Sequence, residues 1–210
     1  MFDRKAVSYM ELHAISSGKE SVASFVQKAK DIYDFVDFIH LRERSWTVKE
    51  YYEAIDCLKR IDKQLHKVII NDRVDVAYTK DLSTVHLPSH GIGADNMKRY
   101  FPNLRFGVSV HSLEEAKKVE QQGASYLFYG HIYPTPSKPN LAPRGIKKLQ
   151  EVVEAVSIPV IAIGGIQTTH LSELRKTGVT GIAVLSGIFS HPSPKEGAEQ
   201  YQKAIYSYYK

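Results

Sequence analysis

Short apolar runs alternate with amphipathic stretches along most of this chain. Runs of four to six β-branched and aromatic residues, bounded by polar or turn-forming residues, are typical of buried strands. We predict eight strands, at residues 12–15, 36–41, 67–70, 84–87, 106–110, 125–129, 160–163 and 181–185. Between them, apolar residues recur at helical spacing, as in the series Val22, Phe25, Val26, Ala29 and Ile32.

Local signals for helix ends support this alternation of strands and helices. A Ser or Thr followed three residues later by Glu matches the capping box that begins a helix; this occurs at Thr47, Ser112 and Ser193. Gly123 and Gly178 follow predicted helices and suit the left-handed conformation that ends them. The segment between residues 70 and 84 is short, so its helix must be small.

Eight strand–helix units without a break in composition predict a single-domain (β/α)₈ TIM barrel of the α/β class. The length of 210 residues is near the lower limit of about 200 for this fold. An open, doubly wound sheet is the alternative. In a barrel, functional residues gather just after the strand ends, whereas an open sheet places them in one crevice.

Composition narrows the range of functions. The chain is 43% hydrophobic and 24% charged, which is ordinary for a globular protein. The net charge is +5, but the Lys and Arg residues are scattered among acidic residues and form no basic block. This distribution favours a small anionic ligand over nucleic acid. The sequence has no run of about 18 apolar residues, so no membrane span is predicted. The N-terminus lacks the apolar core of a signal peptide. The single cysteine, Cys57, excludes an internal disulfide. We expect a cytoplasmic protein, with Cys57 as a small buried hydrophobic residue.

The sixth predicted strand runs into Tyr129-Gly130-His131-Ile132-Tyr133-Pro134-Thr135. Residues 134–143 form the only long irregular segment in the sequence and are a candidate active-site loop. A neutral imidazole at such a strand end can take a proton and return it elsewhere, so His131 is a candidate catalytic residue. The alternative is a solvated histidine hydrogen-bonded to the backbone.

Other strand ends carry candidate binding residues. Alternation places His40 and Arg42 on the same face, where an inward arginine requires an anion or a salt bridge, for example to Glu43. Asn71 or Asp72 after the third strand is a helix N-cap, a ligand contact, or both. The small residues around Ser109 leave room for a ligand or form a tight turn.

The last two strands end in Gly164-Gly165 and Ser186-Gly187. Glycine-rich turns expose backbone N–H groups, and the loops after strands seven and eight of barrels commonly hold phosphate. We therefore expect a phosphate site there; glycines required only for turn geometry are the alternative.

A metal centre is not predicted. The nine histidines form no His-x-His or His-Glu-x-x-His motif. A divalent ion would require His13, His40, His86 and His131 to converge inside the barrel. The tyrosine-rich tail from Tyr201 to Tyr209 is interpreted as a final helix that packs on the barrel or on a second subunit.

Several motifs, in order, resemble the thiamine-phosphate synthase superfamily. They are residues 40–44 (His-Leu-Arg-Glu-Arg), 71–75 (Asn-Asp-Arg-Val-Asp), 85–87 (Val-His-Leu), 107–111 (Gly-Val-Ser-Val-His), 133–138 (Tyr-Pro-Thr-Pro-Ser-Lys), 163–166 (Ile-Gly-Gly-Ile) and 186–188 (Ser-Gly-Ile). The resemblance runs from about residue 11 to the end. Residues 1–9 fall outside it and are expected to be an extension outside the barrel of residues 10–210, with Met10 as a possible start.

The departures from the synthase pattern point to its TenI branch, the thiazole tautomerases. The synthase usually carries Gln at the position of His40, Lys at that of Arg44, and a magnesium-binding aspartate in the stretch occupied here by Pro88-Ser89-His90-Gly91. Loss of that aspartate weakens the expectation of pyrophosphate chemistry, which needs a metal ion to neutralise the leaving group. His131 matches the histidine of the tautomerases.

The resemblance implies a metal-independent enzyme that aromatises a carboxylated thiazole phosphate tautomer, with His131 as general acid and base. It implies phosphate contacts at Gly164, Gly165, Ser186 and Gly187. Arg42 would meet the substrate carboxylate or help to hold the anionic end of the substrate. Ser109, Thr135 and Lys138 would line the pocket, and Asp72 would survive as a structural cap. No cofactor and a homodimer are expected. A thiamine-phosphate synthase and a non-catalytic thiazole-phosphate-binding regulator are the alternatives.

Overall fold

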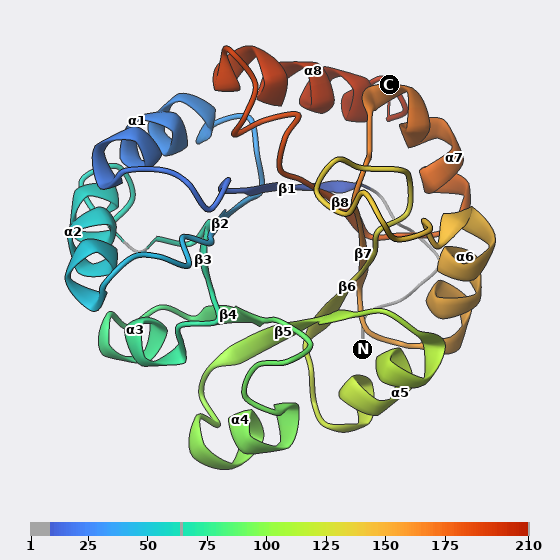
Figure 1. The fold of residues 1–210 in the computed structure, drawn as a ribbon, viewed down its shortest axis with the longest axis horizontal. Helices are drawn as coiled ribbons and strands as arrows, with labels where there is room; N and C mark the ends of the chain where they lie inside the picture. The colour runs from blue at the N-terminus through green and yellow to red at the C-terminus, as the bar shows by residue number, and fades with distance from the viewer. Residues whose placement is uncertain (1–8, 64, 210) are drawn as a thin grey trace.

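The computed structural model describes residues 9–63 and 65–209. Eight parallel strands close into a barrel in the order β1 to β8, and helices surround it (Figure 1). The strands are β1 Glu11–Ile15, β2 Phe38–Leu41, β3 Val68–Asn71, β4 Thr84–Leu87, β5 Arg105–Val110, β6 Tyr126–Gly130, β7 Val160–Ile163 and β8 Gly181–Val184. The prediction of a single-domain (β/α)₈ TIM barrel is confirmed, and the open sheet is wrong because β8 pairs with β1.

The helices follow the strands as the pattern predicts. They are α1 Val22–Ile32, α2 Val48–Leu58, α3 Val74–Thr79, α4 Ala94–Tyr100, α5 Leu113–Gln121, α6 Gly145–Ala155, α7 Leu171–Lys176 and α8 Pro194–Tyr206, with a 3₁₀ turn η1 Thr168–His170 before α7. The helix after β3 is short, as expected. The predicted bounds of β4 and β7 are confirmed, and those of the other strands differ by one or two residues, most at β2, which begins at Phe38 rather than at residue 36.

Parallel register and the period of two along each strand divide the apolar side chains between two cores. The helices bury their apolar faces on the outside of the barrel, as Phe25, Ala29 and Ile32 of α1 do. The barrel interior holds a smaller cluster, made of Ile15, Tyr126, Phe128, Ile161 and Ala183. The buried rings of His13, His40 and His86 pack against Phe128 of this cluster.

The caps agree with the sequence in part. Thr47 and Glu50 form the full capping box of α2. Ser112 accepts from the backbone N–H of Glu115, but the Glu115 carboxylate accepts from His111 N–H instead of closing the box. Gly123 and Gly178 have φ of 93° and 81°.

The segment after β3 differs from the expectation of a cap. Arg73 occupies the N-cap position of α3, and no side chain caps that helix. Asp72 lies in the left-handed region with φ of 67°. The expectation that Asn71 or Asp72 caps this helix is therefore wrong.

Both ends of the described chain pack on the barrel. The Tyr201 hydroxyl of α8 donates to the carbonyl of Ile166 at 2.8 Å, so the tail packs on its own barrel. Residues 1–8 of the expected extension lie outside the described residues. Its last residue, Tyr9, donates a hydrogen bond to Asp37 at 3.1 Å, and Met10 is buried. Cys57 is half-buried rather than fully buried. Of the described helices, none is both long and apolar enough to cross a membrane.

Candidate active site

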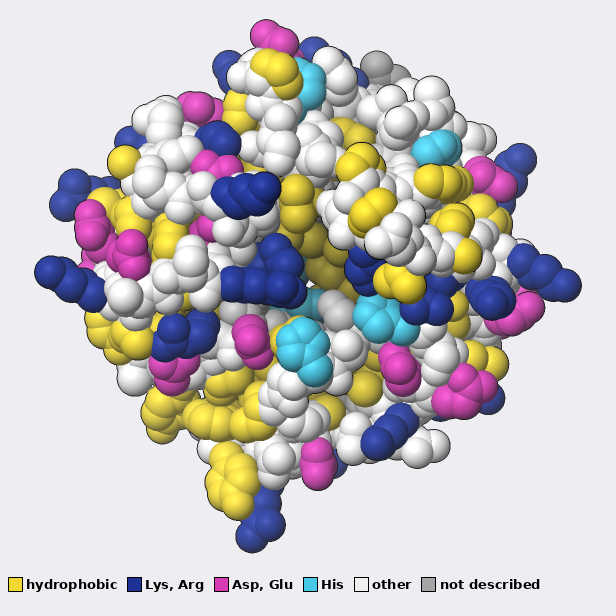
Figure 2. Space-filling model, viewed as in Figure 1, with side chains coloured by type: hydrophobic (Ala, Val, Ile, Leu, Met, Phe, Trp, Pro, Cys, Tyr) yellow, Lys and Arg dark blue, Asp and Glu magenta, His cyan; other side chains and the backbone are white. Residues whose placement is uncertain are grey.

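A cavity of about 240 Å³ opens at the carboxyl ends of the strands. Figure 2 shows it as the hollow at the centre of this face, with Lys and Arg side chains on both sides. The cavity is lined by eight of the residues selected from the sequence, which are Arg42, Ser109, His131, Thr135, Lys138, Gly164, Gly165 and Ser186. Two selected residues, Asp72 and Gly187, do not line it.

His131 stands directly after β6 and is 4% exposed. Its Nε2 lies 3.2 Å from the carbonyl oxygen of Leu141. A carbonyl can only accept, so Nε2 carries the hydrogen and Nδ1 of the neutral ring keeps a free lone pair. The alternative of a solvated histidine is wrong, because His131 is buried, but its hydrogen bond to the backbone is confirmed for one nitrogen. The other remains available as a base in the cavity wall.

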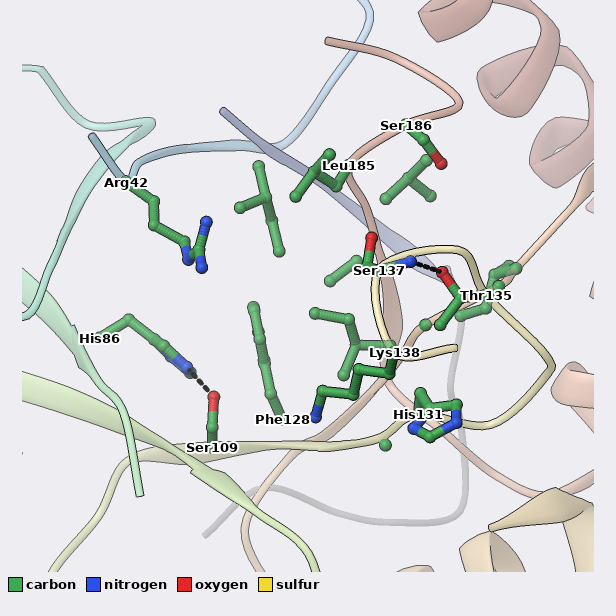
Figure 3. A pocket seen from close by; sticks show the side chains of 18 of the residues that line it. Arg42, His86, Ser109, Phe128, His131, Thr135, Ser137, Lys138, Leu185 and Ser186 are labelled. Carbon is green, nitrogen blue, oxygen red and sulfur yellow. Dashed lines mark hydrogen bonds between the residues drawn. The ribbon is translucent and has the colours of Figure 1, made fainter. Parts of the chain in front are cut away.

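The loop of residues 134–143 forms one wall of the cavity. The Lys138 N–H donates to the Thr135 carbonyl at 3.1 Å, and the Ser137 N–H donates to the Thr135 hydroxyl at 3.3 Å. These bonds fold the loop so that Thr135, Ser137 and Lys138 face the cavity (Figure 3). The loop also supplies the Leu141 carbonyl that accepts from His131. The same loop therefore orients His131 and forms a wall of the cavity.

Two cations reach the cavity without an anionic partner. In the part of the chain that the structure describes, the Arg42 guanidinium and the Lys138 ammonium take part in no ion pair or hydrogen bond. Burial and the neighbouring Arg44 lower the pKa of Arg42 from its ordinary value. Burial and the neighbouring Arg144 likewise lower the pKa of Lys138. Cations left unpaired and partly desolvated are matched by an anionic ligand.

The Glu43 carboxylate, considered as a salt-bridge partner for Arg42, is hydrogen-bonded to backbone instead. The buried Glu43 carboxylate accepts from the backbone N–H groups of Gly18 and Glu20, both at 3.0 Å. A salt bridge between Arg42 and Glu43 is therefore absent. Of the described residues, no Asp or Glu lines the cavity, so its electrostatic character is positive.

The turns after β7 and β8 form the opposite wall. Gly164 and Gly165 have φ of 97° and 68°. A β-carbon on Gly164 would lie 2.2 Å from the His131 β-carbon, so glycine there also permits a close approach. Ser186 lines the cavity, whereas a β-carbon on Gly187 would meet the Tyr201 hydroxyl of α8 at 2.5 Å. Gly187 thus serves the packing of α8, and phosphate contact through its backbone stays a prediction.

Asp72 lines an adjoining cavity of about 300 Å³, which shares Arg42, Asn71, His86 and Ser109 with the first. A β-carbon on Gly91 would lie 3.1 Å from the Asp72 carboxylate oxygen Oδ1. An aspartate at position 91 would therefore face Asp72, but this chain has glycine there. No described group of three His, Cys, Asp or Glu side chains could hold a metal ion. The residues present do not fit a two-carboxylate magnesium site.

Three of the four histidines considered for a metal converge inside the barrel. His13 and His40 are hydrogen-bonded at 3.0 Å, and His86 packs against His40 with ring centroids 5.5 Å apart. Their ring nitrogens are taken up by hydrogen bonds: His86 contacts the Ser109 hydroxyl at 2.8 Å and the Tyr126 hydroxyl at 3.2 Å. They therefore form a hydrogen-bonded interior.

Asn71, considered from the sequence as a ligand contact, lines the cavity, whereas four other lining residues were not selected from the sequence as ligand-facing groups: His86, His111, Phe128 and Ser137. A period-two reading of each strand could have found His86 and Phe128, since inward positions alternate. His111 follows β5 directly, and its Nδ1 lies 3.0 Å from the Gly130 carbonyl oxygen, a contact between two strand ends that no local pattern signals.

A (β/α)₈ barrel with a cavity at the carboxyl ends of its strands has the architecture of the barrel enzymes. The thiamine monophosphate synthase family matches residues 12–188, and the chain therefore belongs to this family of enzymes. A thiamine-phosphate synthase of Caldivirga maquilingensis is 33% identical over 92% of this chain and 95% of its own length. A protein of Aquifex aeolicus named putative thiamine-phosphate synthase 2 is 35% identical over 83% of this chain and 95% of its own.

Solved structures agree with the fold. A thiamine phosphate pyrophosphorylase from Pyrococcus furiosus superposes with a TM-score of 0.82 at 32% identity, covering 96% of this chain and 98% of that one. A 3-hexulose-6-phosphate synthase, at 15% identity and a TM-score of 0.68, shares the fold alone.

Gly164→Ala should destabilise the protein by about 3 kcal/mol or more. The alanine would have to adopt a left-handed backbone conformation, and its β-carbon would clash with the His131 β-carbon. Gly145→Ala is the matched control: its φ is 76°, but nothing lies within 4 Å of the added carbon. The control should lose only about 1–2 kcal/mol. Equal losses in urea unfolding would show that the close approach contributes nothing.

Stability should fall as the pH is lowered below about 6.5. Burial, with a smaller effect of His13, lowers the pKa of His86 from 6.5 to about 3. Between these values the unfolded chain binds one proton more than the folded chain at this site, so the free energy of unfolding rises with pH. The slope approaches about 1.4 kcal/mol per pH unit for one histidine. Denaturant titrations at pH 5–6.5 should show a smaller slope for His86→Gln; an unchanged slope would contradict the assignment.

Proposed function

We propose that the protein is a metal-independent thiazole tautomerase. Its substrate would be 2-[(2R,5Z)-2-carboxy-4-methylthiazol-5(2H)-ylidene]ethyl phosphate and its product the aromatic 2-(2-carboxy-4-methylthiazol-5-yl)ethyl phosphate. The observation that carries the proposal is His131, buried in the wall of an anion-binding cavity with Nε2 bonded to a carbonyl and Nδ1 free. Proton transfer needs such a base, and no metal ion.

The reaction balances within the substrate and one side chain. Nδ1 of His131 takes the proton from ring C2, and the electron pair of the broken C–H bond enters the conjugated system. The imidazolium then gives a proton to the exocyclic ylidene carbon, which forms a new C–H bond and leaves His131 neutral again. Aromatisation of the ring supplies the driving force.

The cavity offers a group for each end of this ligand. The turns at Gly164, Gly165 and Ser186 would hold the phosphate, and Arg42 on the far side of the cavity would meet the carboxylate (Figure 3). Thr135, Lys138 and Ser109 line the space between. Gly187 would contribute only its backbone N–H, and Asp72 lies outside the thiazole cavity.

The second candidate is a thiamine-phosphate synthase, favoured by the names of the relatives at 33–36% identity. That reaction expels pyrophosphate and relies on a metal ion to neutralise it. Gly91 leaves Asp72 without a second carboxylate, and this disfavours the synthase for this chain. A non-catalytic binder of thiazole phosphates is the third hypothesis.

A cytoplasmic location, a homodimer and the absence of a nucleic-acid partner stay predictions from the sequence.

His131→Ala and His131→Asn should lose about 10²–10⁴-fold in turnover, because they remove the base while the rest of the cavity stays. The assay follows the absorbance change on aromatisation, and binding of the aromatic product should persist in both variants. His90→Asn is the control, because His90 is exposed and lines only the adjoining cavity. Wild-type turnover in either His131 variant would refute the assignment.

Arg42→Gln should raise KM about tenfold or more, since a charge-assisted hydrogen bond to the carboxylate contributes about 1.5–3 kcal/mol. Arg44→Gln is its matched control, because Arg44 lines only the adjoining cavity. Steady-state kinetics should show a small change for this control. A larger KM effect at Arg44 than at Arg42 would place the ligand in the adjoining cavity and favour the synthase.

A further inference from the structure

A chain of hydrogen bonds crosses the barrel interior and ends at the cavity. The Glu11 carboxylate oxygen Oε2 lies 3.2 Å from His13 Nε2, and His13 Nδ1 lies 3.0 Å from His40 Nε2. His40 Nδ1 lies 3.0 Å from the side-chain oxygen Oδ1 of Asn71, which lines the cavity. The proposed proton transfer by His131 does not use these four residues.

Because of the strand register, this chain of hydrogen bonds advances toward the carboxyl ends of the strands. Across β1 and β2, His13 pairs with Phe38, so His40 stands two residues further along its strand. Across β2 and β3, His40 pairs with Ile69, so Asn71 again stands two residues further. Each hydrogen bond therefore rises by one layer of inward-facing side chains. Glu11, half-exposed at the amino end of the barrel, is connected in this way to the cavity at the carboxyl end.

The direction of the hydrogen bonds follows from His40. Complete burial, together with His13 and His86, holds the pKa of His40 well below its ordinary value, so the ring is neutral and has one N–H. Nδ1 faces the Asn71 oxygen, which accepts, so the hydrogen is on Nδ1. His40 Nε2 must then accept from Nδ1–H of His13.

His13 therefore needs two N–H groups. Its Nδ1 donates to His40, and its Nε2 faces the Glu11 carboxylate, which only accepts. The titratable groups around the His13 ring are Glu11, His40, His86 and Tyr126. Burial raises the pKa of Tyr126, so its hydroxyl stays neutral and Glu11 is the anion of this group. The geometry is that of an imidazolium paired with a carboxylate.

We propose that Glu11, His13 and His40 are positioning residues that hold the Asn71 amide with its NH₂ group turned into the cavity. Loss of the proton on His13 Nδ1 would leave the bond to Glu11 as it is, but it would reverse the two hydrogen bonds on either side of His40 and present the Asn71 carbonyl oxygen instead. An anion is bound by the NH₂ group and repelled by the oxygen. The chain thus selects anionic ligands, and in this respect it rests on the proposed function of the cavity.

The direct test is nitrogen NMR of the histidine rings in ¹⁵N-labelled protein without ligand at pH 7. We expect one proton on Nδ1 of His40 and protons on both nitrogens of His13. A proton on Nε2 of His40 with a neutral His13 would overturn the proposal. This readout needs no turnover, so failure of the tautomerase assay would leave it intact.

Glu11→Gln tests whether the second proton on His13 depends on Glu11, without changing the tautomer of His40. The Gln amide can donate to His13 Nε2, so His13 should become neutral with its proton on Nδ1, and His40 should keep its tautomer. Glu114→Gln, at an exposed helix position, should leave both rings as in the wild type. A doubly protonated His13 in Glu11→Gln would overturn the pairing with Glu11.

Asn71→Asp tests the consequence for binding. An aspartate accepts from His40 equally well but presents an oxygen to the cavity, so affinity for the aromatic product should fall more than tenfold in calorimetry. Asn71→Ser, which keeps a donor, should lose less. Equal affinity in Asn71→Asp and wild type would overturn the assigned orientation.

Discussion

The site depends on the close contact of two strand ends. The backbone N–H of Ile132 donates to the Ile163 carbonyl and that of Tyr133 to the Gly164 carbonyl, both at 3.0 Å. This pairing continues the contact of β6 and β7 beyond the barrel and presses His131 onto Gly164, where a β-carbon has no room. The His131 ring and the glycine turn after β7 are thereby fixed next to each other, and under the proposed function this gives the reacting atoms a defined geometry.

The charges around this contact favour one chemistry over another. Arg42 and Lys138 reach the cavity unpaired, and no carboxylate of the described residues lines it. Asp72 stands in the adjoining cavity opposite Gly91, where a second carboxylate is missing. Under the proposed function these cations meet a carboxylated phosphate, and the described residues at Asp72 and Gly91 do not form a carboxylate pair of the kind that holds magnesium. The family follows from a match over residues 12–188, while the proposed reaction rests on these few positions.

Much of this could be predicted from the sequence because the signals are local. Apolar runs gave the strands, and residues directly after them, such as Arg42, His131 and Gly164, face the cavity because barrels place strand ends there. The roles of Asp72 and Gly187 could not be predicted: the first depends on a left-handed turn and the second on the distant Tyr201. The chain from Glu11 to Asn71 depends on the register of three strands, which no local pattern specifies.

The most direct measurement compares both reactions in one preparation of the full chain. The carboxythiazole phosphate tautomer is supplied with EDTA, and in parallel the pyrimidine pyrophosphate and thiazole phosphate are supplied with magnesium. The account predicts rapid aromatisation in EDTA and no coupling above the uncatalysed rate. Magnesium-dependent coupling without aromatisation would contradict it and identify the chain as a synthase.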